Sequence, residues 1–288
     1  MNLFGWSIVF NVVILTRASA FDFFSRYLFT PGIKLHKDTL TKEHLHAARL
    51  CKLVYDDDYL HKSERFVDVP STDVQCSMSV DDHKLYVVFR GSDDKTDWSH
   101  NFNMNLVEYP AKSKNQLHAG FVVQWLSVRE EVKKKIKDML KSNKGIETVI
   151  FTGHSAGSPP ACLCAKEIDL EAGVRVITFG SPRFSNEAFK AEFETTQKCT
   201  RIVLDRDLVT RFPINFYNGY AHVGSPLQLR DGHVLQRDTT NFETFKWFLL
   251  GIPNLDFGVL DHRIENYVEK IENVLLTKQS ASSSSSCL

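Results

Sequence analysis

Short apolar runs alternate with longer segments of helical periodicity along most of the chain. Four runs rich in β-branched and aromatic residues predict strands, at residues 84–89, 148–152, 175–179 and 201–204. From Val122 to Lys141, apolar residues recur at helical spacing while a cluster of lysines falls on the other face, which predicts an amphipathic helix. Strands that alternate with helices predict an α/β protein built on a central sheet.

Both ends of the chain differ in composition from its middle. Residues 1–20 hold a short apolar stretch followed by Ala18-Ser19-Ala20, a pattern typical of a cleaved signal peptide, which predicts a secreted or endomembrane-lumenal protein. The stretch is too short to cross a bilayer, and an uncleaved segment that associates with a membrane is the alternative. Residues 278–288 are serine-rich and predict a disordered tail. Because no repeat or linker interrupts the sequence between these ends, residues 21–277 are expected to form one domain.

The net charge and the number of cysteines limit which binding partners and which kinds of site are expected. Lys plus Arg and Asp plus Glu number 35 each, so no basic excess is available to neutralise a nucleic-acid backbone. The six cysteines are too few for a disulfide scaffold, and no Cys or His spacing matches a zinc site. Nucleic acid and a metal ion are therefore not expected, and the sequence indicates no protein partner. The 21 phenylalanines suit either a core or a site for an apolar ligand.

The sequence Gly153-His154-Ser155-Ala156-Gly157 follows a predicted strand directly and precedes a helical pattern. A G-x-S-x-G motif in this context is a nucleophile elbow, a sharp turn that leaves the serine hydroxyl exposed at the positive end of a helix. Glycines on either side remove the Cβ atoms that would clash in such a turn. Ser155 is therefore the candidate nucleophile.

A nucleophilic serine also needs a general base and a carboxylate that orients the base. Asp205 and Asp207 come directly after the predicted strand at residues 201–204, and three histidines, His222, His233 and His262, lie later in the chain. This is the order Ser, Asp, His that α/β-hydrolases use. The spacing alone leaves the choice among these histidines open.

An ordered series of motifs resembles the class 3 lipases and covers about residues 45–267. In chain order they are Phe89-Arg90-Gly91-Ser92, Trp98, Asn101, His118-Ala119-Gly120-Phe121, the GHSAG elbow, Phe179-Gly180-Ser181-Pro182-Arg183, Asp207-x-Val209-x-x-x-Pro213 and Tyr220-x-His222-x-Gly224. The resemblance implies an α/β-hydrolase fold, with a central, mostly parallel sheet flanked by helices. It also implies hydrolysis of carboxylic esters of lipids, without a cofactor.

Carried over position by position, the resemblance implies that Ser155 is the nucleophile, Asp207 the acid and His262 the base. His222 is the rival base, and Asp205 is expected to be a surface or structural carboxylate. The resemblance also assigns the oxyanion donors to Ser92 and to the main-chain N–H of Ala156.

The sequence departs from the family pattern directly after the elbow. It has Ser158-Pro159-Pro160 where the family has a second glycine and a small apolar residue. Pro160 is expected to remove one helical hydrogen bond or to tilt the start of the helix.

Two segments are candidates for contact with the substrate. Trp98 lies in a polar stretch where the family places a lid helix, and the alternative is a surface loop whose Trp packs inward. Phe248 and Leu249 lie in an apolar stretch before His262 that suits an acyl-pocket wall or the core.

The expected function is that of a serine ester hydrolase similar to triacylglycerol lipases, acting on a lipid ester at a lipid–water interface. The alternatives within the family are a phospholipase A1 or galactolipase and an esterase of soluble or feruloyl esters. A catalytically silent lipid-binding module is the alternative from another class.

Overall fold

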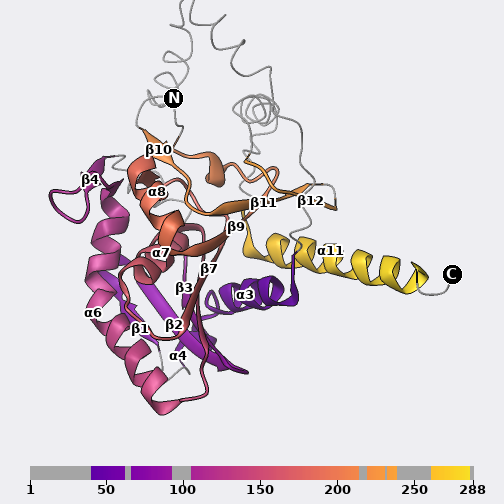
Figure 1. Ribbon diagram of the computed structural model, residues 1–288, viewed down its shortest axis with the longest axis horizontal. Coiled ribbons are helices and arrows are strands. Elements are labelled where there is room, and N and C mark those ends of the chain that lie inside the picture. The colour runs from indigo at the N-terminus through magenta and orange to yellow at the C-terminus, as the bar shows by residue number, and fades with distance from the viewer. Residues whose placement is uncertain are drawn as a thin grey trace, which may run out of the picture.

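The computed structural model describes residues 40–61, 66–92, 105–213, 219–230, 232–238 and 261–285. An eight-stranded sheet runs through the middle of these residues in the order β1-β2-β3-β6-β7-β9-β11-β12 (Figure 1). Its strands are β1 (Val67–Val69), β2 (Val74–Asp81), β3 (Lys84–Phe89), β6 (Thr148–His154), β7 (Gly173–Phe179), β9 (Lys198–Leu204), β11 (Ser225–Arg230) and β12 (His233–Leu235). The five strands from β3 to β11 are parallel, and β1, β2 and β12 add antiparallel edges.

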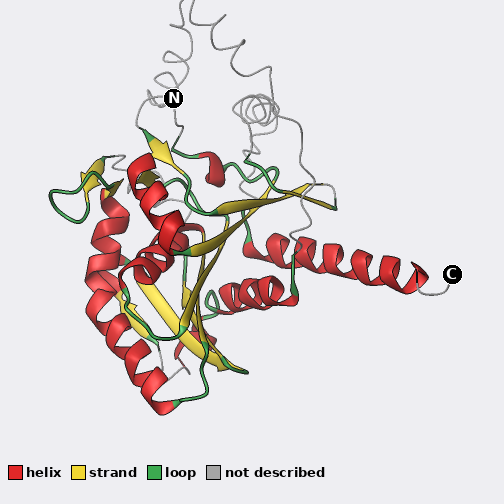
Figure 2. Cartoon of the chain, in the orientation of Figure 1, coloured by secondary structure: helices red, strands yellow, loops and turns green. Residues whose placement is uncertain are grey.

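Helices cover both faces of this sheet (Figure 2). They are α3 (Lys42–Leu53), α4 (Asp57–His61), α6 (Ala119–Ser142), α7 (Ser158–Glu167), α8 (Glu187–Thr196) and α11 (Ile264–Ser285), with 3-10 turns η1 (Pro70–Thr72), η2 (Ser155–Gly157) and η3 (Val209–Arg211). One core lies between the sheet and α6 and α7, and a second lies between the sheet and α3 and α11. Successive residues of one strand serve opposite cores, as Val87 and Val88 do, because side chains alternate across a sheet.

The four predicted strands and the predicted helix at 122–141 are confirmed. The mostly parallel sheet between two helical layers is the predicted α/β-hydrolase architecture. A smaller antiparallel sheet in the order β10-β8-β5-β4 was not predicted. Its strands are β4 (Leu106–Glu108), β5 (Gln116–His118), β8 (Ser185–Asn186) and β10 (Tyr220–Ala221).

The C-terminal helix differs from its prediction. Disorder was expected from residue 278, but α11 continues to Ser285, and its end extends away from the sheet in Figure 1. Buried Ile264, Tyr267 and Ile271 anchor its first turns, and once a helix is nucleated each added residue costs little free energy. The predicted signal peptide at 1–20 lies outside the described residues. None of the helices in the described part of the chain combines the length and the hydropathy that a bilayer crossing requires.

Candidate active site

The elbow is the sharp turn that the motif predicts. Strand β6 ends at His154, η2 turns the chain and α7 begins at Ser158. Ser155 has a φ of 56°, in the left-handed region that non-glycine residues rarely adopt. A Cβ on Gly153 would lie 2.3 Å from the carbonyl oxygen of Gly157, and one on Gly157 would lie 2.3 Å from that of Phe89. Glycine at both positions is therefore a steric requirement of the turn.

The fold brings the three predicted triad residues into hydrogen-bond contact. His262 Nε2 lies 2.8 Å from Ser155 Oγ, and His262 Nδ1 lies 2.8 Å from Asp207 Oδ2. Because the carboxylate can only accept, Nδ1 carries the proton and Nε2 is free to accept the serine hydroxyl proton. Ser155 is the first residue of η2, Asp207 lies in the turn between β9 and η3, and His262 lies in the turn before α11. This arrangement can activate Ser155 as a nucleophile.

Asp207 is fully buried and held by further donors. Its Oδ1 accepts the main-chain N–H of Val209 at 2.9 Å, and its Oδ2 accepts the hydroxyl of Tyr267 at 2.6 Å. Burial opposes ionisation, but the contacts with His262 and Tyr267 outweigh it and lower the pKa of Asp207 below its ordinary value. The carboxylate therefore stays charged and can fix the His262 tautomer. Tyr267 was missed in the sequence, where no local signal distinguishes it from a core residue of α11.

Gly180 lets the loop after β7 pack against the His–Asp pair. Its φ is +60°, and a Cβ there would lie 3.0 Å from His262 Cε1 and 3.1 Å from Asp207 Oδ2. Any side chain would strain the backbone and push on both groups.

His222, the rival base, and Asp205, the other carboxylate after the predicted strand, make contacts outside the triad. The ring of His222 hydrogen-bonds the main chain of Thr210, and burial, together with Arg201 and Arg183, holds its pKa well below the usual value. Asp205 is buried, accepting Gln228 Nε2 at 2.7 Å and Arg230 Nε at 3.0 Å. Asp205 is thus a structural carboxylate rather than a surface one.

The predicted oxyanion donors lie on two segments that adjoin Ser155. Ser92 follows β3 in a loop whose Gly91 touches the elbow: a Cβ on Gly91 would lie 3.1 Å from Ser155 Cβ. Ala156 lies in the first turn after the nucleophile, where main-chain N–H groups have no intrahelical acceptor. Both segments can present N–H groups to an oxygen bound at Ser155.

The prolines after the elbow do not remove the helical hydrogen bond that was expected to be lost. Helix α7 begins at Ser158, so Pro159 and Pro160 fall in its first turn, where no intrahelical hydrogen bond is lost. The hydroxyl of Ser158 donates to the carbonyl of Gly153 at 3.0 Å and ties the helix start to the strand end.

Three substrate-contact candidates, Trp98, Phe248 and Leu249, lie outside the described residues. In the described ranges, no three His, Cys, Asp or Glu side chains gather closely enough to hold a metal ion.

Sequence and structural comparisons show which proteins this chain is similar to. Residues 86–217, from β3 through the elbow and past Asp207, match the family model described as lipase (class 3). Over these residues the chain resembles the class 3 lipases.

Relatives of the chain include a lipase of Rhizomucor miehei, 29% identical over 187 residues that cover 62% of the chain and 50% of the relative. A secreted mono- and diacylglycerol lipase of Fusarium solani is 31% identical over 160 residues, covering 54% of the chain and 47% of the relative. The match thus spans about half the length of these relatives. The solved structure of the Rhizomucor miehei triacylglyceride lipase superposes with a TM-score of 0.62 at 23% identity, covering 73% of this chain and 90% of that one, which shows the shared α/β-hydrolase fold.

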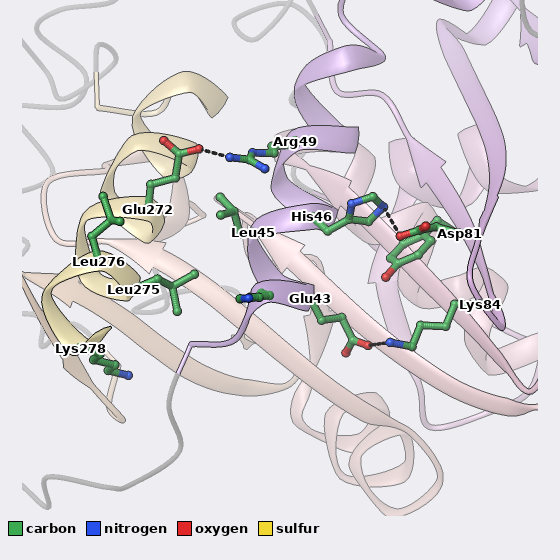
Figure 3. A pocket seen from close by; sticks show the side chains of 12 residues that line it. Glu43, Leu45, His46, Arg49, Asp81, Lys84, Glu272, Leu275, Leu276 and Lys278 are labelled. Carbon is green, nitrogen blue, oxygen red and sulfur yellow. Dashed lines mark hydrogen bonds and ion pairs between the residues drawn. The ribbon is translucent and has the colours of Figure 1, made fainter. Parts of the chain in front are cut away.

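A groove of about 860 Å³ between α3 and α11 is separate from the triad (Figure 3). Two ion pairs lie in its lining, with Lys84 Nζ 2.9 Å from Glu43 Oε1 and Arg49 Nη2 2.5 Å from Glu272 Oε1. It contains none of the three triad residues. The candidate active site is therefore the elbow and not the groove.

His154, inside the elbow motif, is a buried imidazole held at both nitrogens. Its Nδ1 lies 2.8 Å from the Tyr55 hydroxyl and its Nε2 lies 2.7 Å from the main-chain oxygen of His262. Burial, and secondarily the neighbouring His262, lowers its pKa to about 3. His154 is therefore neutral in the folded protein at neutral and mildly acidic pH.

This neutral histidine makes stability depend on pH. Between a folded pKa of about 3 and an unfolded one of about 6.5, the unfolded chain binds more protons, so the free energy of unfolding falls as pH drops below about 6.5. At pH 5 we expect a loss of about 2 kcal/mol from His154 alone. His44, His118 and His222, whose pKa values are also lowered, act in the same direction.

Urea unfolding at pH 7.5 and pH 5 measures this effect, since most carboxylates do not titrate in that range. The matched control is His154→Gln, which keeps an amide donor but does not titrate and should lose less stability at pH 5. Equal pH dependence in the two proteins would show that His154 is not the neutral buried group described here.

Proposed function

We propose that the protein is a serine carboxylic-ester hydrolase acting on acylglycerols, similar to triacylglycerol lipases. The observation that carries the proposal is the chain of two 2.8 Å contacts from Ser155 through His262 to Asp207 at the strained elbow. Two relatives named as lipases, one of them for mono- and diacylglycerols, support a glycerol ester of fatty acids as the substrate.

In the proposed mechanism, Ser155 Oγ attacks the ester carbonyl carbon while its proton passes to His262 Nε2. Asp207 holds the Nδ1 proton and stabilises the imidazolium. Main-chain N–H groups at Ser92 and Ala156 stabilise the oxyanion of the tetrahedral intermediate. His262 then protonates the leaving alcohol, and a water molecule, activated by the same base, releases the fatty acid from the acyl-enzyme.

The substrate class is tested with a panel of esters at equal bulk concentration. We expect turnover of emulsified triacylglycerol, diacylglycerol and monoacylglycerol to exceed that of phospholipid vesicles, because the neutral chain suits an uncharged ester. Released fatty acid is titrated in each case, with the Ser155→Ala protein as the blank.

Faster release from phospholipid vesicles would assign the protein to the phospholipase A1 alternative. Turnover confined to monomeric p-nitrophenyl or feruloyl esters would assign it to the soluble esterases. Either result would contradict the proposal that acylglycerols are the substrate, but both are compatible with ester hydrolysis by the proposed triad.

Secretion after cleavage behind Ala20 is part of the proposal, and the relative from Fusarium solani is likewise named a secreted lipase. Protein collected from the medium of an expressing cell should then begin at Phe21.

A further inference from the structure

A chain of hydrogen bonds connects Tyr55, just beyond the end of α3, with the main chain of His262. A carbonyl oxygen can only accept, so the 2.7 Å contact with the oxygen of His262 requires the proton of His154 on Nε2. In a neutral imidazole, Nδ1 must then accept, and at 2.8 Å its donor is the Tyr55 hydroxyl. The chain therefore runs in one direction, from Tyr55 through His154 to His262.

The surroundings of His154 keep this direction fixed. Its side chain is buried, with the rings of His262 and Tyr267 at centroid distances of 4.7 Å and 5.8 Å. A second proton on the ring would place a positive charge in this buried site, and Nδ1 could then no longer accept from the Tyr55 hydroxyl. Because the pKa of His154 is about 3, the ring does not take up this second proton at neutral pH.

The Tyr55 hydroxyl also reaches the other side of the site. It accepts the main-chain N–H of Gly91, the residue before the proposed oxyanion donor Ser92. The guanidinium of Arg90 lies 5.6 Å from the centre of the Tyr55 ring, and Arg90 Nη1 donates to Asp57 Oδ1 at 2.8 Å. Tyr55 and Asp57, at the corner between α3 and α4, thus bind the residues that follow β3 and hold them in place.

We propose that Tyr55 and His154 are positioning residues: one hydroxyl and one imidazole tie the main chain of His262 and the loop at Gly91–Ser92 to the elbow. This inference rests on the proposed function, since it concerns how the proposed base and oxyanion donor are aligned with Ser155. Neither residue touches the reacting atoms. Their effect is geometric, because misplacement of a catalytic group by a fraction of an ångström lowers the rate.

The first test is Tyr55→Phe, which keeps the ring that contacts Arg90 and removes only the hydroxyl. We expect kcat for a p-nitrophenyl ester to fall about tenfold or more, with KM changed less than about twofold, because alignment and not substrate binding is lost. The control is Tyr220→Phe, whose buried hydroxyl has no hydrogen-bond partner within the described residues. That variant should retain the wild-type kcat.

The second test asks whether the two residues act as one unit. His154→Gln retains an amide donor for the oxygen of His262 but removes the Nδ1 that accepts from Tyr55, while the contact of Tyr55 with Gly91 remains. Adding Tyr55→Phe to His154→Gln should therefore lower kcat by a smaller factor than Tyr55→Phe does in the wild-type protein. His154→Phe retains neither group and should be slower than His154→Gln. Losses that multiply in the double variant, or a Tyr55→Phe protein with unchanged kcat, would overturn the inference.

A third measurement needs no activity. Nitrogen NMR of the wild-type protein at pH 7 should show His154 neutral with its proton on Nε2, and Tyr55→Phe should relax that preference. A proton on Nδ1, or a doubly protonated ring, would contradict the hydrogen-bond chain from Tyr55 through His154 to His262, regardless of which substrate the protein hydrolyses. If this tautomer is found but no ester is hydrolysed, the proposed function is wrong while the hydrogen-bond chain through His154 is confirmed.

Discussion

Ser155→Ala is expected to lower kcat on a p-nitrophenyl ester on the order of a thousandfold or more, with the fold intact. Without the hydroxyl no acyl-enzyme forms, and only the oxyanion donors and the binding surface still assist attack by water. His262→Ala should cost a similar factor, and the double variant should be no slower than either single one, because the two residues act as a unit. Steady-state kinetics and far-UV circular dichroism measure activity and fold together.

Other histidines provide the controls for this prediction. His233→Ala changes an exposed residue of β12 and should leave kcat unchanged. His222→Gln changes a half-buried residue whose ring hydrogen-bonds the main chain of Thr210, and it should lower stability without a comparable loss of kcat per folded molecule. If His262→Ala hydrolysed the ester at the wild-type rate while His222→Gln did not, the base assignment would be wrong.

Gly157→Ala is expected to lower the free energy of unfolding by about 3 kcal/mol or more. The new Cβ would lie 2.3 Å from the carbonyl oxygen of Phe89 and 2.8 Å from that of Arg90. Both are main-chain atoms next to the elbow and cannot move without displacing β3 or the loop after it. Urea unfolding and soluble yield measure the change.

Gly173→Ala is the matched control for the elbow glycine. Its Cβ would meet the carbonyl oxygen of Glu147 and Oγ1 of Thr148 at 3.5 Å, an ordinary van der Waals distance. This variant should be about as stable as the wild type. A Gly157→Ala protein that is equally stable would contradict the packing of the elbow against β3.

The strands predicted from the sequence are those buried on both faces, and the predicted helix is one whose apolar residues recur at helical spacing over many turns. Strands β3, β6, β7 and β9 lie inside the sheet, so both of their faces are apolar and they stand out as continuous runs. Strand β2 was missed because its sequence VQCSMSVD mixes serines and glutamine with apolar residues, as suits a strand nearer the edge.

The candidate nucleophile was predictable because it lies in one local motif. Two carboxylates, Asp205 and Asp207, follow the predicted strand, and the resemblance singled out Asp207 as the candidate acid. The base was not predictable from spacing: three histidines satisfied the chain order, and only the resemblance singled out His262. The folded chain brings His262 to Ser155 across 107 positions of sequence. Tyr55, His154 and Tyr267 were missed because each acts through a contact between distant segments, which leaves no local pattern.

The most direct test of the proposed triad is covalent labelling by a fluorophosphonate probe, followed by mass spectrometry of the modified peptide. The reagent reacts with a serine only when a base activates its hydroxyl. We expect a single adduct on Ser155 in the wild-type protein and in His233→Ala, and greatly slowed labelling in His262→Ala. An unlabelled wild-type protein, an adduct on another serine, or labelling of His262→Ala at the wild-type rate would contradict a triad of Ser155, His262 and Asp207.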